Sequence, residues 1–323
     1  MRQLKVLVLA VFVSVFLFPV ASNAQQEDGA GGLSISPTRF EYVIERGADE
    51  LATIQLKNVS PRDIIAKAIL NDFEPDGETG IPKLIVDAEP GESASSLINF
   101  ITPIEDIRIA AGQTEVVKIP IIIPENAAPG AYYGAIRFQV APADVGNEDN
   151  STQLSLNASV ASIVLIEVPG NITEKIEVET VSAYLANKKG SLFTKKPDQI
   201  GVVINNLGNG FAKPFGTVTV QGPWGRGEVQ NYELNDSSPR GNILPNSKRL
   251  FSEALTGVSM PGRYTIQANV SHGSGGDVLT ATTSFWYIPT WLVVVVILLV
   301  LFTAALIYYL YRKYVTKSTK KRR

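Results

Sequence analysis

A short turn sequence, Pro-Gly-x-Tyr, occurs twice in this chain, and each copy opens a strand of alternating apolar residues. The copies occupy residues 129–132 and 261–264. After the second turn, every other residue from Tyr264 to Val270 is apolar, which is the period of a half-buried β-strand. Clusters rich in Pro, Gly, Asn and Asp separate further segments of this kind, and no long stretch between Leu33 and Ile288 has helical spacing. The chain is therefore predicted to be all-β, with one structural unit repeated.

The position of the two tyrosines indicates what the unit is. In immunoglobulin-like sandwiches, a Tyr after the turn into the sixth strand sends its hydroxyl back to upstream backbone. We expect Tyr132 and Tyr264 to form such structural corners in two tandem immunoglobulin-like β-sandwiches, at residues 25–170 and 171–288. Because the chain contains no cysteine, disulfides, a thiol nucleophile and a thiolate metal site are all excluded.

Both ends of the chain carry apolar segments. Arg2 and Lys5 precede an uncharged run that ends in small residues before Ala24, which predicts a secretory signal peptide over residues 1–24. Residues 291–311 are uncharged and bordered by Trp and Tyr, which predicts a transmembrane helix over residues 289–311. The basic residues of the tail, 312–323, place the C-terminus in the cytoplasm by the positive-inside rule. We expect a single-pass plasma-membrane protein with both sandwiches outside the cytoplasm.

Charge is distributed unevenly between the two predicted domains. Residues 25–170 contain 9 basic and 22 acidic residues, a formal charge of −13, and residues 171–288 contain 11 and 9, a charge of +2. An acidic surface repels polyanions, so nucleic acid is not an expected partner.

Several segments resemble a known family. The order "ISPTRFEYVIERG", "IQLKNVSPRD" and "ENAAPGAYYGAIRF", followed by "PGRYTIQANV", an anchor and a basic tail, is similar to the WxL-interacting surface proteins of Gram-positive bacteria. More distantly, the first domain resembles the N-terminal domain of pilus chaperones. The first resemblance implies a membrane-anchored adapter that contacts peptidoglycan with its first domain and holds secreted WxL-domain proteins or host ligands with the remainder. It assigns no binding residue in this chain.

One acidic segment is a weak candidate for a calcium loop. In "DFEPDGETGIPK", the residues Asp72, Glu74, Asp76 and Glu78 have the spacing of the start of such a loop. An EF-hand would place a bidentate Glu at its twelfth position, where this chain has Lys83, and helices on both sides. An acidic hairpin with an Asp-Gly turn is the competing interpretation.

Little in the sequence favours an enzyme. His272 is the only histidine, and it lies with Ser271 and Asp277 in a glycine-rich turn that is poorly suited to hold a catalytic triad. No cofactor motif is present. We therefore expect a non-enzymatic binding and display protein, with cell-wall polymer, surface proteins or secreted proteins as partners. The alternative is a membrane-tethered assembly chaperone that acts by β-strand donation, which a long uncovered edge strand in the first domain would favour.

A basic loop is expected near the membrane. Lys188, Lys189, Lys195 and Lys196 lie in "ANKKGSLFTKKPDQ", early in the second domain. If strands alternate in direction, this loop shares an end of the sandwich with Ile288 and faces the lipid surface. A solvated hairpin loop kept soluble by its charge is the competing interpretation.

Overall fold

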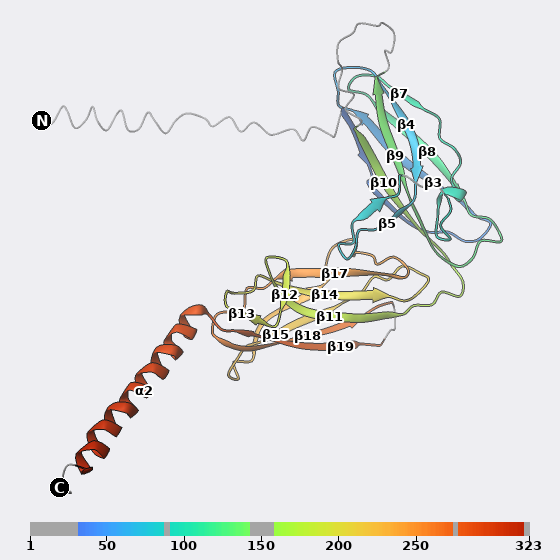
Figure 1. Ribbon diagram of the computed structural model, residues 1–323. Helices are drawn as coiled ribbons and strands as arrows, with labels where there is room; N and C mark the ends of the chain where they lie inside the picture. The colour runs from blue at the N-terminus through green and yellow to red at the C-terminus, as the bar shows by residue number, and fades with distance from the viewer. Residues whose placement is uncertain (1–31, 87–90, 143–157, 274–276, 320–323) are drawn as a thin grey trace, which may run out of the picture.

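The computed structural model describes residues 32–86, 91–142, 158–273 and 277–319. The predicted signal peptide over residues 1–24 lies outside this range, as do the last four residues of the basic tail. The described chain forms two β-sandwiches in series, followed by one long helix (Figure 1). The predicted fold class, two immunoglobulin-like sandwiches with a C-terminal apolar helix, is confirmed.

The first sandwich packs a three-stranded sheet, β1-β3-β8, against a five-stranded sheet, β2-β10-β9-β4-β7. The small sheet contains β1 (Leu33–Ser36), β3 (Asp49–Asn58) and β8 (Thr114–Ile122). The large sheet contains β2 (Arg39–Val43), β4 (Ile64–Asn71), β7 (Ile107–Ile109), β9 (Gly130–Pro142) and β10 (Ser159–Val168). The first two strands belong to different sheets, so the chain crosses from one sheet to the other between them. Strand β1 is antiparallel to β3 in the small sheet, and β2 is parallel to β10 in the large sheet.

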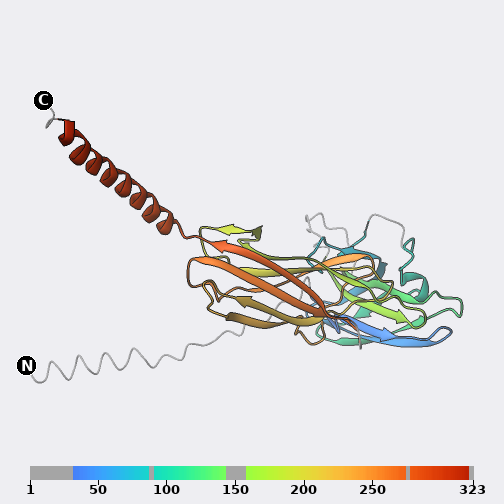
Figure 2. The ribbon, with the colours of Figure 1, turned by 90° about the horizontal axis from the view of Figure 1, so that it is seen from below.

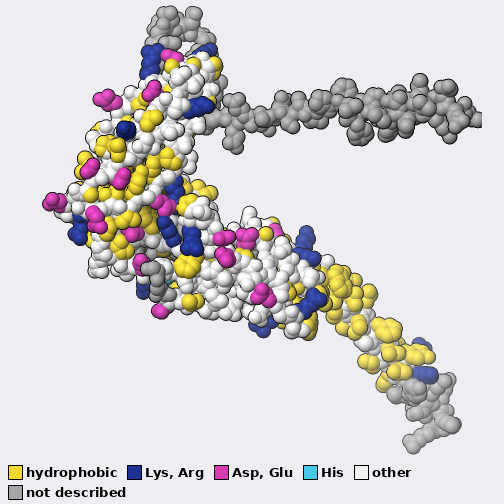
Figure 3. All heavy atoms as spheres, turned by 180° about the vertical axis from the view of Figure 1, so that it is seen from behind, with side chains coloured by type: hydrophobic (Ala, Val, Ile, Leu, Met, Phe, Trp, Pro, Cys, Tyr) yellow, Lys and Arg dark blue, Asp and Glu magenta, His cyan; other side chains and the backbone are white. Residues whose placement is uncertain are grey.

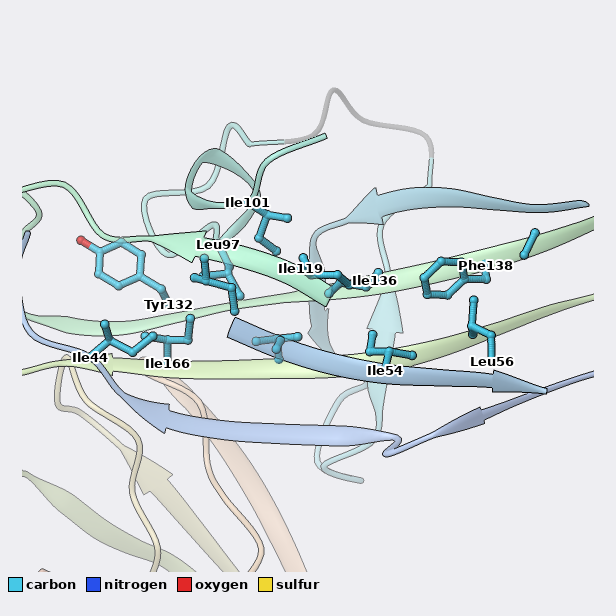
Figure 4. Packing of buried hydrophobic residues seen from close by; sticks show 14 of the residues in the cluster. Ile44, Ile54, Leu56, Leu97, Ile101, Ile119, Tyr132, Ile136, Phe138 and Ile166 are labelled. Atoms are coloured by element: carbon cyan, nitrogen blue, oxygen red, sulfur yellow. The ribbon is translucent and has the colours of Figure 1, made fainter. Parts of the chain in front are cut away.

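The core of the first sandwich follows from strand alternation. Along β3, Ala52, Ile54 and Leu56 are fully buried, and the residues between them face solvent. Because side chains alternate across a sheet, every second residue of β3 meets inward residues of the opposite sheet, among them Ile136 and Phe138 of β9 (Figure 4). Apolar burial on this face is what specifies the strand register.

The second sandwich packs a four-stranded sheet, β12-β11-β14-β17, against a five-stranded sheet, β13-β19-β18-β15-β16. The strands of the first sheet are β11 (Ile176–Leu185), β12 (Lys188–Gly190), β14 (Gln199–Asn206) and β17 (Ser247–Ala254). Those of the second are β13 (Leu192–Phe193), β15 (Phe215–Gln221), β16 (Glu228–Leu234), β18 (Gly262–Ser271) and β19 (Leu279–Tyr287). Along β18, the alternate residues Tyr264, Ile266, Ala268 and Val270 are buried in its core.

Two small elements project from the first sandwich. Strands β5 (Phe73–Pro75) and β6 (Pro82–Leu84) form a two-stranded hairpin, and a 3-10 turn, η2 (Ile98–Phe100), lies between β6 and β7. In Figure 1 the β5 hairpin extends from the first sandwich to the second. This hairpin contains the acidic segment that was considered for calcium.

Helix α2 (Thr290–Thr319) follows β19 after only two residues, Ile288 and Pro289 (Figure 2). Its segment Thr290–Lys313 has a mean hydropathy of 3.0 and is not buried by any other described part of the chain. At about 1.5 Å per residue, a helix of this length exceeds the roughly 30 Å of a bilayer core. By length and composition, α2 is able to cross a membrane.

Candidate functional site

The β5-β6 hairpin of the first sandwich contacts strand β17 of the second. The backbone N–H of Leu250 donates to the carbonyl of Glu78 at 2.7 Å, and Lys248 Nζ lies 2.9 Å from the Glu78 carboxylate. Gly80 lies directly against the Arg249 side chain, where a Cβ atom would come within 2.3 Å of Nε. The hairpin therefore acts as a brace between the two sandwiches.

The first Pro-Gly turn makes a second contact between the sandwiches. Ala131 N–H donates to the carbonyl of Asn209 at 2.9 Å, and Asn209 Nδ2 donates to the carbonyl of Pro129 at 3.3 Å. Gly130 has a φ of 145° and no side chain, and a Cβ there would lie 3.0 Å from the Asn209 carbonyl. Glycine is required at this position because it permits both the backbone conformation and the close approach.

A small apolar cluster fills the junction between these contacts. Phe73, Ala135 and Leu165 of the first sandwich are buried in it. Residues from both domains pack around them, namely Leu84, Tyr133, Ile163, Phe211 and Leu244. The rings of Tyr133 and Phe211, one from each sandwich, have their centroids 6.3 Å apart. Apolar burial thus adds to the hydrogen bonds that hold the two domains at an angle.

A cavity of about 230 Å³ lies beside this cluster, between the sandwiches. Its apolar wall includes Phe73, Ile81, Leu165 and Leu244. Its charged wall consists of Arg39 from β2 and of Lys248 and Arg249 from β17, and no carboxylate of the described residues lines it. We call this cavity the interdomain cleft.

Asn242 is the buried polar residue of the cleft. It is 9% exposed, lines the cleft and also a neighbouring cavity, and neither Oδ1 nor Nδ2 has a hydrogen-bond partner among the described residues. Leaving a buried polar group without a partner costs about 1–3 kcal/mol of folding stability. A ligand in the cleft that offers both a donor and an acceptor would recover that energy.

Of the three cations that line the cleft, Arg39 and Lys248 form ion pairs with carboxylates outside it, whereas Arg249 forms none with the described residues. Arg39 forms an ion pair with Glu41, but its Nε is buried without a hydrogen-bond partner among the described residues. Burial lowers the pKa of Arg249, and the nearby positive charge of Arg39 lowers it further. Arg249 also donates to the Asn242 carbonyl at 2.9 Å. A buried guanidinium group beside a second cation favours binding of an anion.

The neighbouring cavity, of about 360 Å³, is mixed in charge. Glu41, Glu167 and Glu174 line it together with Lys175, Lys213 and His272. Burial raises the pKa of Glu167, and the charge of Glu174 raises it further, while Lys213 opposes the shift. Glu41 forms an ion pair with Lys213, which joins β2 to the second sandwich.

The four carboxylates considered for calcium do not converge. Asp72 is 8% exposed and accepts the Gly91 N–H at 2.9 Å, Glu74 pairs with Lys83 at 3.1 Å, and Glu78 pairs with Lys248. In the part of the chain that the structure describes, no three His, Cys, Asp or Glu side chains form a group that could hold a metal ion. The segment forms the competing structure, an acidic hairpin, whose contacts are with the second domain.

The single histidine lies at the border of the neighbouring cavity. His272 Nδ1 is buried and has no hydrogen-bond partner among the described residues, so neither Ser271 nor Asp277 orients the ring. This arrangement lacks the oriented base that a catalytic triad requires.

Both tyrosines of the repeated turn direct their hydroxyls to backbone four residues upstream. Tyr132 Oη donates to the Ala128 carbonyl at 2.9 Å, and its ring lies 4.8 Å from that of Phe100. Tyr264 Oη donates to the Met260 carbonyl at 2.7 Å and accepts the Met260 N–H at 3.1 Å. Each ring seals one end of its core while its hydroxyl is paired, which is the geometry of a tyrosine corner.

The basic loop lies next to the start of the helix. Strand β13 pairs with the end of β19, with Leu192 opposite Trp286, and the Ile288 N–H donates to the Phe193 carbonyl at 2.8 Å. Lys188 and Lys189 form β12 beside it, and Lys195 and Lys196 are exposed immediately after β13.

The interdomain cleft was not predicted from the sequence. Arg39 belongs to the first sandwich and Asn242 and Arg249 to the second, no motif links them, and only the packing of the two sandwiches brings Arg39 to the other two. The one sequence feature that pointed to this region was the acidic turn "PDGETG". Its length between two short apolar segments indicates a projecting hairpin, but not which part of the protein the hairpin contacts.

Comparisons with known proteins do not identify a family for this chain. No protein-family model matches the chain, and no curated protein matches it, so membership in the WxL-interacting family stays a prediction. Similar solved structures include a chain of a chaperone and tip-adhesin complex of CFA/I fimbriae, at 14% identity and a TM-score of 0.39, and the class 5 fimbriae chaperone CfaA, at 15% and 0.38. Each alignment covers 80% of this chain and 99% of the other. The E. coli chaperone DraB aligns at 14% identity with a TM-score of 0.34, over 79% of this chain and 96% of that one. All three TM-scores are below 0.5, so no conclusion about this chain rests on these alignments.

Proposed function

We propose that this chain is a membrane-anchored, non-catalytic binding protein that holds a protein partner in the cleft between its two sandwiches. The observation that carries the proposal is Asn242, a buried amide with no partner for either polar atom, in a cavity to which both domains contribute. Folding alone does not explain such a residue, because an apolar side chain of similar volume would be more stable there.

The walls of the cleft define the chemistry of the partner. One wall is apolar and the other presents Arg39 and Arg249, so the ligand has an apolar body and an anionic group. An extended polypeptide segment with a large apolar side chain next to a carboxylate has this character, and its backbone supplies the donor and acceptor that Asn242 lacks. No feature of the cleft favours a cell-wall polymer, so the proposal is confined to protein partners.

The helix sets where binding takes place. The apolar segment of α2 is followed by the basic residues of the tail, 312–323, which the positive-inside rule assigns to the cytoplasm, and both sandwiches are then extracytoplasmic. The protein would display its cleft on the outer side of the plasma membrane.

The experiment is a capture assay with the full-length chain in detergent micelles, exposed to secreted proteins and cell-wall fragments of the same organism. Asn242→Leu replaces the unpaired amide with an apolar group of similar volume, and we expect it to retain or increase folding stability while it reduces capture. Arg39→Met tests the anionic contact in the same way. Arg108→Ala is the matched control, because Arg108 is an exposed arginine of the first domain paired with Asp63.

Loss of capture in the two cleft variants, with normal thermal unfolding, supports the proposal. Full capture by both variants, or capture of cell-wall fragments in place of proteins, overturns it.

A second candidate function is strand addition at the edge of the first sandwich. Strand β8 spans nine residues, and among the described residues it pairs along its length only with β3, with one isolated bridge between Ile101 and Ile121. This is the long uncovered edge strand that favours the assembly-chaperone alternative. An exposed row of backbone N–H and C=O groups is a template for a client strand.

The orientation of β8 allows a direct test. Along β8, the backbone N–H and C=O groups of successive residues point alternately toward β3 and toward the open edge. The Asn58 N–H donates to Gln113 O and the Ile123 N–H donates to Ala48 O, so in this alternation the backbone groups of Lys118 and Pro120 point away from β3. Lys118→Pro therefore removes an N–H from the open edge without breaking the ladder to β3. Loss of capture in Lys118→Pro together with retention in Asn242→Leu would identify the edge, rather than the cleft, as the binding site.

A further inference from the structure

The end of the second sandwich nearest to α2 carries an exposed tryptophan that neither the fold nor the cleft uses. Trp224 lies in the turn between β15 and β16 and is 80% exposed. It is 62 residues before Trp286 in sequence, yet it lies at the same end of the sandwich. Its turn packs on the second Pro-Gly turn, since a Cβ at Gly262 would lie 2.4 Å from Pro223, and Gly262 pairs with Tyr287.

The backbone holds this ring outward at an energetic cost. Trp224 has a φ of 59°, a left-handed conformation that is unusual for a bulky residue. Its Nε1 donates to the Pro261 carbonyl at 3.0 Å, which fixes the indole over the turn while leaving most of the ring in contact with solvent. Residues held in such conformations cluster at functional sites, so the strain points to a role for the exposed ring.

Other apolar side chains are exposed on the same end. Leu192 is 62% exposed, Trp286 is 46% exposed and Met260 is 40% exposed. We call the loops that carry them, residues 186–198, 222–228, 254–262 and 286–290, the helix-proximal end. Large apolar side chains gathered at one end of a domain indicate a surface that is covered in the working protein.

Cations surround these apolar groups. The helix-proximal end and the adjoining strand residues carry Lys188, Lys189, Lys195, Lys196, Arg226 and Arg263, against the acidic residues Asp198, Glu228 and Glu253. Figure 3 shows Lys and Arg side chains grouped where the second sandwich meets the apolar helix. Basic residues around exposed aromatic rings match the chemistry of a lipid headgroup layer.

The tether limits what this end can meet. Only Ile288 and Pro289 separate β19 from α2, and two or three extended residues reach at most about 11 Å. The bilayer that holds α2 is therefore within side-chain reach of the helix-proximal end, whichever side of the membrane it occupies.

We propose that the helix-proximal end of the second sandwich docks on the bilayer surface, with the Trp224 ring inserted at headgroup level and the surrounding lysines and arginines on anionic headgroups. Indole rings favour this depth because their apolar face meets acyl chains while the ring N–H stays in a polar layer. The second-sandwich residues that line the interdomain cleft, within 242–249, lie at and before the start of β17, at the opposite end of that strand from the helix-proximal end, so docking would hold the cleft at a fixed distance from the membrane. This inference does not depend on what the cleft binds.

The test uses the full-length chain reconstituted in vesicles of phosphatidylcholine, with and without phosphatidylglycerol. The chain has three tryptophans, so Trp286→Phe with Trp291→Phe leaves Trp224 as the only indole. Its fluorescence is measured with lipids brominated in the acyl chain and with acrylamide in the aqueous phase. We expect loss of Trp224 fluorescence in brominated vesicles and protection from acrylamide, both stronger when phosphatidylglycerol is present.

A matched control places the indole at the other end of the same sandwich. In a chain with all three tryptophans replaced by Phe, Val278→Trp puts the probe at an exposed position just before β19. This probe should be quenched by acrylamide and unaffected by brominated lipid. Replacing the four loop lysines, 188, 189, 195 and 196, with Gln should remove the effect of phosphatidylglycerol on Trp224.

Two outcomes overturn the proposal. Quenching of Trp224 by acrylamide and not by brominated lipid would show that the ring is in water. Protection from both quenchers would show that a protein surface, such as a second copy of this chain, covers it.

Discussion

Truncation of the second corner tyrosine, Tyr264→Phe, should destabilise the second sandwich by about 1–3 kcal/mol. The hydroxyl makes two hydrogen bonds to Met260, as donor at 2.7 Å and as acceptor at 3.1 Å, and the side chain is 1% exposed. Each such bond contributes about 0.5–1.5 kcal/mol net, and its loss leaves both backbone groups of Met260 without their partner. Tyr132→Phe removes one bond, at 2.9 Å, so it should cost the first sandwich about half as much.

The assay is urea unfolding of the full-length chain in detergent micelles. All three tryptophans lie in the second sandwich or the helix, so indole fluorescence reports on the second sandwich and far-ultraviolet circular dichroism on both. Tyr264→Phe should shift the fluorescence midpoint to lower urea at an unchanged m-value.

A control substitution in the same domain distinguishes the effect of losing the hydrogen bonds of Tyr264 from the effect of removing a tyrosine hydroxyl as such. Tyr232 has a buried hydroxyl with no partner among the described residues, and burial raises its pKa. Tyr232→Phe should therefore be neutral or stabilising. If Tyr232→Phe costs as much as Tyr264→Phe, or if Tyr264→Phe leaves the midpoint unchanged, the corner interpretation is wrong.

Three further predictions concern the contacts described above. The pKa of Glu167 is raised in the folded protein, so the carboxyl group binds its proton more tightly in the folded than in the unfolded state. The resulting contribution to the free energy of unfolding is complete below the ordinary pKa of 4.5 and is lost as pH rises through the pKa of the folded state. Glu167→Gln should therefore remove this loss of stability when unfolding is measured between about pH 4 and 8. Gly262→Ala places a Cβ 2.4 Å from Pro223 at a φ of 146°, and should cost about 1–3 kcal/mol in the fluorescence assay. Lys248→Ala removes exposed ion pairs to Glu78 and Glu179 and should leave the unfolding midpoint unchanged; a large shift would show that the brace depends on charge.

Strand alternation and turn composition were sufficient to predict the fold class. The apolar residues that alternate along β3, β8, β9 and β18 are the residues that the structure buries, because a strand has only two faces and one of them must meet the opposing sheet. Pro120 lies in β8, an edge strand of its sheet, where a residue without a backbone N–H is tolerated.

Local sequence did not predict what the β5-β6 hairpin contacts. Its four carboxylates have the spacing of the start of a calcium loop. Two of them instead form ion pairs: Glu74 with Lys83 of the neighbouring strand, and Glu78 with Lys248 of the other domain. Trp224 was overlooked for a related reason. A Trp in a Gly-rich turn has no periodic signal, and its exposure depends on the packing of that turn against Pro261 and Gly262.

The sequence by itself determined the parts of this protein that depend on neighbours along the chain: which segments are strands, where they turn, that the sandwich occurs twice, and that the last helix is apolar enough to span a bilayer. Only the tertiary structure decided the cleft, since Arg39 of the first domain meets Asn242 and Arg249 of the second only where the two domains pack together. It also decided that the first Pro-Gly turn contacts the second domain while the second turn faces the helix. The physical reason is that alternation and turn chemistry act over a few residues, whereas contacts between domains depend on surfaces assembled from segments up to about 200 residues apart.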